Sequence, residues 1–295
     1  MATSALTDPP NLDKKGADLD RQRFRMLEDI AQELSSEVVF PSSFDTVVRL
    51  RKALQDPALS IAKIADVIAL EPLVAARVLS LANSALYSRH GSQARDLRHA
   101  IERIGVQAVR TAAMAIAMRQ LVMARDVPVF RRQSNDLWRH SLHTAAAAYV
   151  VARRMSRVNP EEAQLTGMIH DIGAFYMLYR AAQYEELVQR PDSANHLVVR
   201  WHESIGHSVA IALGLPEDMA EAVADHDHPR LFADPPQTLA DVVRIANRLA
   251  GGLIEWGDMP VDEAALDEAR LAEIEATLGE EIQAHAAAMT AVFAG

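Results

Sequence analysis

Apolar residues recur at helical spacing along most of this chain. In the segment SIAKIADVIAL, Ser60 can cap a helix, and one face of that helix would carry Ile61, Ile64, Ala65 and Ile68. The adjoining segment EPLVAARVLSLANSALY repeats the pattern after a proline, which a first helical turn tolerates. The two segments therefore predict a helix pair.

The same spacing, with few internal glycines or prolines, predicts further helices at residues 21–36, 43–55, 96–103, 106–124, 135–156, 197–213, 217–226 and 236–255, and one from Pro160 to His170. In the segment 135–156, the small residues of TAAAA would let another helix pack closely. Strand signals are nearly absent beyond the short run DVPVF. The pattern predicts an all-α protein with no repeat period.

The periodicity also suggests how the chain is organised. Residues 1–20 are polar and contain prolines, which is typical of a flexible tail. We expect one domain over residues 21–256, with an amino-terminal helical lobe at about 21–125 and a helical core at about 126–256. Residues 257–295 are predicted to form one or two amphipathic acidic helices, whose apolar face would suit an oligomer contact.

Composition narrows the class of protein. The chain has 295 residues, of which 49% are hydrophobic, enough for a substantial core. A formal net charge of -10 argues against general affinity for nucleic acid. The absence of cysteine excludes disulfides and thiolate metal sites, and no apolar run approaches the roughly 20 residues that cross a bilayer. We expect a cytoplasmic protein with no membrane or nucleic-acid partner.

Nearly all of the positive charge is carried by arginine. Several arginines gather around the segment 135–156, namely Arg131, Arg132, Arg139, Arg153, Arg154 and Arg157. A solvated helix face is the favoured interpretation, and a contact with a nucleotide phosphate or another small anion is the alternative.

The candidate chemistry centres on the adjacent pair His170-Asp171 in QLTGMIHDIGAF. A histidine nitrogen beside a carboxylate oxygen can hold one divalent metal or bridge two, if distant segments supply further ligands. The candidates for those ligands are His140, His202, His226 and Asn247. Each residue also has a simpler interpretation: His140 as a satisfied boundary histidine, and the His170-Asp171 pair as a local hydrogen bond that orders a bend.

The remaining histidines are weaker candidates. His202 and His207 lie five residues apart and so do not share a helix face, and at most one of them should point into a site. His226 and His228 precede Pro229, where a helix should end, and an exposed cluster at that end is the alternative to a ligand role for His226. His143 follows His140 by three residues and either flanks the same surface or is solvent-exposed.

Four segments together resemble the HDOD family, the HD-related output domains of bacterial signalling proteins. They are FPSSFDTVVRLRKALQDPALSIAKIADVIALEPLVAARVLSLANSALYS, LRHAIERIGVQAVRTAAMAIAM, LWRHSLHTAAAAYVVARR and GMIHDIGAFYML. The resemblance covers residues 36–250, and its most specific part is the EPxxxxRVLxLANSAxY stretch. It implies an all-helical domain with an HD-like core, related to metal-dependent phosphohydrolases, associated with signalling proteins and mostly non-catalytic.

The resemblance also implies roles for the candidate residues. His140 matches the first histidine of the wider HD superfamily, and His170 with Asp171 matches the His-Asp pair that gives it its name. His202 matches a histidine of the two-metal subset, and His226 the first member of its His-His doublet.

Three positions depart from the superfamily pattern. Asp227 stands where the doublet has a second histidine, Asn247 where a late aspartate is expected, and Ala174 where a lysine often follows HDIG. Because an amide carries no charge, we expect weak binding of Mg²⁺ or Mn²⁺. Zn²⁺, Fe²⁺ or Ni²⁺ could still bind the imidazoles.

These observations lead to the sequence-based hypothesis of a non-catalytic signal-transduction domain. It would bind a partner signalling protein or a small ligand through a degenerate cleft around His140, His202, His226 and Asn247. We expect no resident cofactor, treat His140, His170 and Asp171 as a vestigial metal set, and assign no catalytic residue. The alternative is a metal-dependent phosphohydrolase that acts on a nucleotide or phosphomonoester.

Overall fold

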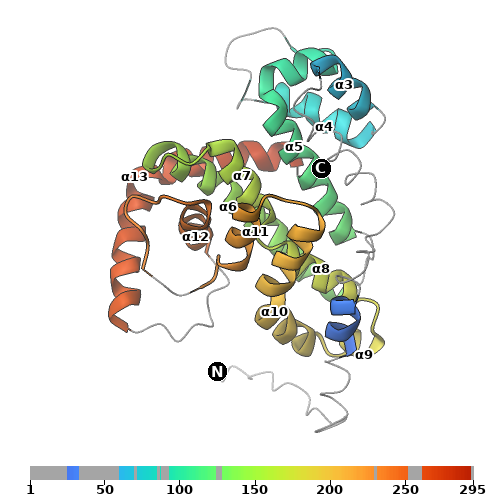
Figure 1. Ribbon diagram of the computed structural model, residues 1–295, viewed down its shortest axis with the longest axis vertical. Coiled ribbons are helices and arrows are strands. Elements are labelled where there is room, and N and C mark those ends of the chain that lie inside the picture. The colour runs from blue at the N-terminus through green and yellow to red at the C-terminus, as the bar shows by residue number, and fades with distance from the viewer. Residues whose placement is uncertain are drawn as a thin grey trace, which may run out of the picture.

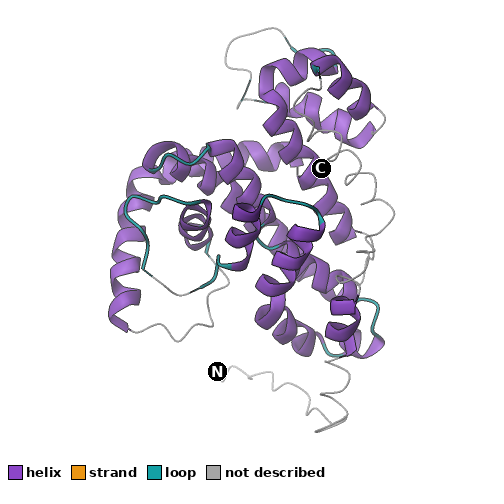
Figure 2. Ribbon diagram, viewed as in Figure 1, coloured by secondary structure: helices purple, strands orange, loops and turns teal. Residues whose placement is uncertain are grey.

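The computed structural model describes residues 25–32, 60–69, 72–84, 87, 93–123, 128–228, 231–251 and 261–293. Within these ranges the regular elements are all helices, so the all-α prediction is confirmed (Figures 1 and 2). The predicted tail 1–20 and the predicted helix 43–55 lie outside the described residues. Of the predicted helix 21–36, residues 25–32 are described and helical.

The amino-terminal part forms a small helical lobe at the top of Figure 1. It contains α3 (Ile61–Ala69), α4 (Pro72–Ala82) and the first turns of α5 (Leu97–Met123). The predicted pair α3 and α4 packs together and against α5. Gly105, with a φ of 79°, kinks α5 where the sequence predicted a break between two helices.

The core consists of seven helices: α6 (Pro128–Met155), α7 (Pro160–Ile169), α8 (Ile172–Ala181), α9 (Glu185–Gln189), α10 (Pro191–Ala212), α11 (Glu217–Ala224) and α12 (Leu239–Leu249). Helix α6 is the centre of this part, since α7 and α12 both pack against it. The last residues of DVPVF begin α6 and do not form a strand.

The sequence pattern did not reveal α8 and α9. Nine of the ten residues of α8 are buried, so the helix has no polar face that would produce an amphipathic period. Helix α9 has five residues, too few for a periodic signal. The HDIG segment, which carries the candidate site residues, therefore leads directly into a helix that is almost entirely buried.

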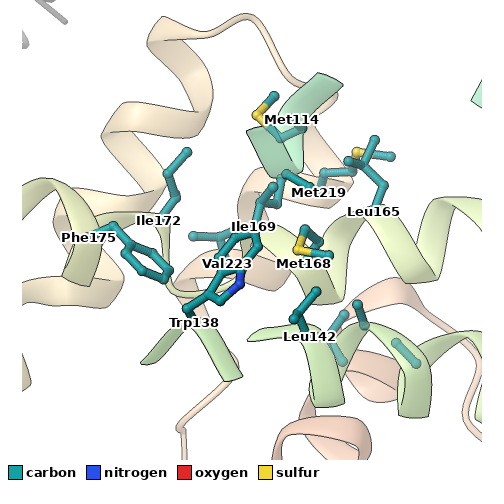
Figure 3. Close-up of a cluster of buried hydrophobic side chains, with 14 of the residues drawn as sticks. Met114, Trp138, Leu142, Leu165, Met168, Ile169, Ile172, Phe175, Met219 and Val223 are labelled. Atoms are coloured by element: carbon teal, nitrogen blue, oxygen red, sulfur yellow. The ribbon is translucent and has the colours of Figure 1, made fainter. Parts of the chain in front are cut away.

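Buried apolar side chains pack around the residues that flank the His-Asp pair in sequence. Figure 3 shows Ile169, Ile172 and Phe175 from α7 and α8 beside Trp138 and Leu142 from α6. All five are at least 93% buried. This packing fixes the turn between α7 and α8 against α6.

The carboxy-terminal segment forms a single helix, α13 (Val261–Phe293), which packs along α6 and reaches α4. Its His285 stacks on Tyr149 of α6 with ring centroids 4.5 Å apart. Glu281 forms ion pairs with Arg153 and Arg154. The division of the chain into lobe, core and extension stays a prediction, although α13 lies on the core.

The buried His285 makes the docking of α13 sensitive to acid. Burial, with a smaller contribution from Arg153, lowers the pKa of His285 from 6.5 to about 4. The unfolded chain therefore takes up a proton first as pH falls. Stability from the neutral ring is complete above pH 6.5 and is lost between pH 6.5 and 4.

We expect the free energy of unfolding to drop by about 3 kcal/mol over this range from His285 alone. The substitution His285→Phe keeps the ring stack and should remove this part of the pH dependence. Urea unfolding at several pH values tests it, with the exposed His228→Gln as a control that leaves the profile unchanged. An unaltered profile for His285→Phe would contradict the assignment.

Candidate metal centre

Close packing of α6 on α7 brings the first candidate residues together. A Cβ on Gly167 of α7 would lie 3.0 Å from the Cβ of Ala148 and 3.0 Å from the carbonyl of Thr144. The small residues of α6 thus allow the close approach that the sequence predicted. As a result His140, on α6, faces His170, which directly follows α7.

A second close contact brings α10 to the same place. A Cβ on Gly173, in the first turn of α8, would lie 2.0 Å from the carbonyl oxygen of His202 and 2.5 Å from the nitrogen of Gly206. Only glycine fits at this crossing of α8 and α10. Asp171, just before α8, is thereby held beside His202 of α10.

The first group of ligand atoms combines α6 with the α7–α8 junction. The Nε2 atoms of His140 and His170 lie 3.1 Å apart. The Oδ2 atom of Asp171 is 3.1 Å from Nε2 of His170 and 3.7 Å from Nε2 of His140. These three residues form one cluster able to hold a metal ion.

The second group lies on the other side of the same carboxylate. The Nε2 atoms of His202 and His226 are also 3.1 Å apart. The Oδ1 atom of Asp171 is 3.3 Å from Nε2 of His226 and 3.8 Å from Nε2 of His202. Asp171 therefore stands between two pairs of imidazoles, one facing each oxygen.

Backbone carbonyls fix which nitrogen of these rings is protonated. The Nδ1 atom of His170 donates to the carbonyl of Gly167 at 2.7 Å, and that of His226 to the carbonyl of Val223 at 2.7 Å. Nδ1 of His202 likewise faces a carbonyl of the preceding turn at 3.0 Å. Because a carbonyl only accepts, the neutral rings carry the proton on Nδ1 and direct the Nε2 lone pair inward.

The donor set fits a divalent metal. Two lone pairs 3.1 Å apart repel unless a proton or an ion lies between them. Two nitrogens on one tetrahedral zinc ion would lie about 3.3 Å apart, given usual bond lengths. Both Asp171 oxygens are fully buried and accept no well-aligned hydrogen bond, as expected for a carboxylate shaped to bind cations.

The charges and the burial of the centre shift the pKa values of its own groups. Burial alone would raise the pKa of Asp171, but His170 and His226 outweigh it and hold that pKa well below its usual value. Burial alone would lower the pKa of His226, but Asp171 and Asp227 raise it to about 9. Burial and His170 lower the pKa of His140. A metal would displace the proton from His226, since both use the same lone pair.

Asn247 and Asp227 complete the wall of the second group. The Nδ2 atom of Asn247, on α12, donates to Oδ1 of Asp227 at 2.7 Å. The Oδ2 atom of Asp227 lies 3.3 Å from Nε2 of His202 and 3.8 Å from Nε2 of His226. Sequence reasoning noted Asp227 as a departure from the doublet and did not count it among the candidate residues.

The structure thus brings together all six sequence-derived candidates: His140, His170, Asp171, His202, His226 and Asn247. The weaker candidates lie elsewhere. His228 is exposed, and His143 faces Gln283 on α13. Arg139, Arg153 and Arg154 form ion pairs with nearby carboxylates, which agrees with the solvated-face interpretation.

A pocket of about 430 Å³ opens beside His140. Its wall is mostly apolar, and its described lining residues include Gln133, Leu137, His140, Leu178, Asn195 and Val198. Neither arginine nor lysine occurs among these lining residues. The pocket therefore offers a route toward the first group, but its described residues supply no cation that would hold a phosphate strongly.

A family model for the HDOD domain matches residues 40–229, more than half of the chain. The chain therefore belongs to the HDOD family, as its sequence motifs indicated. No curated protein matches it significantly. Among its described residues, no helix has both the length and the apolar character needed to cross a membrane.

Solved structures share the fold. A protein of Shewanella amazonensis SB2B, provisionally named a metal-dependent phosphohydrolase, is 22% identical; the match covers 92% of this chain and 99% of that one, with a TM-score of 0.70. An HDOD domain protein of unknown function from Geobacter sulfurreducens is 24% identical; the match covers 93% of this chain and 99% of that one, with a TM-score of 0.64. A protein of Marinobacter aquaeolei VT8, provisionally named a signal transduction protein, is 18% identical; the match covers 95% of this chain and 68% of that one, with a TM-score of 0.54. At these identities the likeness establishes the fold alone.

Proposed function

We propose that this chain is a regulatory protein of the HDOD family in which the buried His/Asp centre binds divalent transition metal. The observation that carries this proposal is the position of Asp171. Its two oxygens each face a pair of imidazole nitrogens at 3.1–3.8 Å. Imidazole-rich sites of this kind suit Zn²⁺, Fe²⁺ or Ni²⁺, and the added carboxylates also suit Mn²⁺.

Burial favours a regulatory role over a catalytic one. Catalytic metal sites keep an open coordination position for water or substrate. Here His170, Asp171 and His226 are at most 1% exposed, and the adjacent pocket has no described cation to hold a phosphate. A metal in this centre would stabilise the helix arrangement and carry a signal to the pocket and to the outer helices.

The pocket beside His140 is the proposed site for a small signal molecule. Its apolar wall and its amides, Gln133 and Asn195, suit a largely neutral ligand, and the carboxylate of Asp136 disfavours an anionic one. A ligand there would touch His140 and so alter the first group of metal ligands. Partner signalling proteins in the cytoplasm would then respond to the change in helix packing.

A metal-dependent phosphohydrolase is the second candidate function. The feature that favours it is one carboxylate shared by two groups of ligands, since paired metal ions activate water and stabilise the leaving oxygen in many phosphatases. In that case His140 would be the ligand of the first group most accessible to a substrate, because its side chain is 13% exposed whereas those of His170 and Asp171 are at most 1% exposed.

Metal analysis of the purified protein, followed by hydrolysis assays, separates the two functions. We expect the protein to bind at least one equivalent of Zn²⁺, Fe²⁺ or Mn²⁺ and to show no turnover of nucleotides or phosphomonoesters with added Mn²⁺. Turnover that disappears in Asp171→Asn would establish the enzyme instead. A protein that binds none of these ions would refute the metal-binding role.

A further inference from the structure

We propose that Asp227 is a metal ligand and that Asn247 is the residue that positions it. The ion between His202 and His226 would then bind more tightly than the ion between His140 and His170. This inference rests on the proposed metal-binding function, but it concerns a carboxylate outside the two clusters described above.

The position of Asp227 supports a ligand role. Its Oδ2 atom lies 3.3 Å from Nε2 of His202 and 3.8 Å from Nε2 of His226. These separations match those between Asp171 and the same two rings, 3.8 Å and 3.3 Å. Two carboxylates thus approach one pair of imidazoles in an equivalent way.

Asn247 determines which oxygen of Asp227 faces the histidines. Its Nδ2 atom donates to Oδ1 of Asp227 at 2.7 Å and points to the carbonyl of His226 at 3.4 Å. Only an amide NH₂ can serve two acceptors here, so an aspartate at position 247 could not make these contacts and would repel Asp227. Asn247 is 1% exposed, and α12, which carries it, begins with a capping box of Thr238 and Asp241.

The backbone also holds Asp227. Its N–H donates to Oε1 of Glu203 on α10 at 3.1 Å. A contact to α10 therefore holds the backbone of Asp227, and a contact to α12 holds its carboxylate. Outer contacts of this kind orient ligands and affect metal affinity strongly in known metal sites.

The consequence is an asymmetric centre. The group around His202 and His226 would have two imidazoles, the shared Asp171 and the unshared Asp227. The group around His140 and His170 has two imidazoles and only the shared carboxylate. Because anionic oxygen attracts a divalent ion more strongly than a neutral donor, the first ion should occupy the His202 side.

This arrangement changes the meaning of the amide at position 247. From the sequence, Asn247 signified a missing negative charge. In the structure, a carboxylate at position 227 restores a negative charge to the centre, and the amide holds it in place.

Titration of the metal-stripped, full-length protein with Co²⁺ or Mn²⁺ tests the inference. We expect one tight and one weaker ion in the unchanged protein. Asn247→Leu should weaken the tight ion by about 10–100-fold, and Asp227→Asn should weaken it further. The exposed Asp192→Asn on α10 removes a carboxylate elsewhere and should leave both affinities unchanged.

Two histidine variants show which group holds the tight ion. His140→Ala should keep it and lose the weaker one, whereas His202→Ala should lose the tight ion. Thermal melting in EDTA, with the Co²⁺ absorption spectrum, distinguishes a ligand from a merely structural residue, which would alter the melt but not the spectrum.

The outcomes also separate this inference from the proposed function. If the unchanged protein binds metal and Asp227→Asn binds it equally well, Asp227 is not a ligand and only this inference fails. If the unchanged protein binds neither ion, both fail.

Discussion

Replacing Gly173 by alanine is expected to disrupt the core of the protein. The new Cβ would lie 2.0 Å from the carbonyl oxygen of His202 and 2.5 Å from the nitrogen of Gly206. Both obstacles are backbone atoms, so no side chain can rotate away. Overpacking of a core typically costs about 1–3 kcal/mol, and this contact should lie at or above the upper end of that range.

The same change elsewhere provides a matched control. Gly279 lies within α13, and its Cβ would meet only the side chain of Glu275, at 3.6 Å. Gly279→Ala should therefore stabilise the protein by about 1 kcal/mol through helix propensity. Urea unfolding of both variants tests the pair of predictions. A Gly173→Ala variant as stable as the original protein would mean that α8 and α10 do not approach so closely.

Gly173 also connects stability with the metal centre. If the variant is soluble at low temperature, the displaced α8 should move Asp171 away from His202. Metal affinity should then fall along with stability, whereas Gly279→Ala should bind metal normally.

Amphipathic helices could be predicted from the sequence because one face of each is buried and the other solvated. Helix α3 buries Ile64, Ala65 and Ile68 of the face that its spacing predicted, but Ile61, the first residue of the helix, is 37% exposed because no further turn covers it. Helix α8 could not be found in this way because its environment is apolar on nearly every side. Its burial depends on tertiary packing against α5 and α10, which no local pattern encodes.

The candidate site was predictable in its residue types but not in its geometry. The motif likeness selected His140, the His170-Asp171 pair, His202 and His226, and the structure places their ligand atoms together. Spacing along the chain cannot show that helices α6, α10 and α11 converge, because convergence depends on the Gly167 and Gly173 contacts.

Asp227 was missed as a candidate because sequence comparison treats a substituted position as a loss. The signal was present in the segment ADHDHP, where an acidic residue directly follows His226. Its meaning depends on Asn247, twenty residues further along and on another helix. Asp227 and Asn247 both depart from the superfamily pattern, and they contact each other. Two such residues can together replace the role of the usual ones.

Asp171→Asn is expected to abolish binding of the ion beside His140 and His170 and to weaken strongly the binding of the ion beside His202 and His226. Asparagine keeps the shape of the side chain but removes the one charge that both groups of ligands share. Its NH₂ would also direct hydrogens at one pair of Nε2 atoms, where a cation would otherwise lie. Because the side chain is 1% exposed, water cannot replace the lost oxygen.

Thermal melting with and without added Zn²⁺ or Mn²⁺ measures this loss. A ligand at 100 times its Kd stabilises the fold by about 2.7 kcal/mol, so the unchanged protein should melt at a clearly higher temperature with metal. Asp171→Asn should show a much smaller rise, while the exposed Asp192→Asn should behave like the unchanged protein. A metal-dependent rise as large as that of the unchanged protein would show that Asp171 is not the ligand shared by the two groups, because only Asp227 would remain to supply an anionic oxygen.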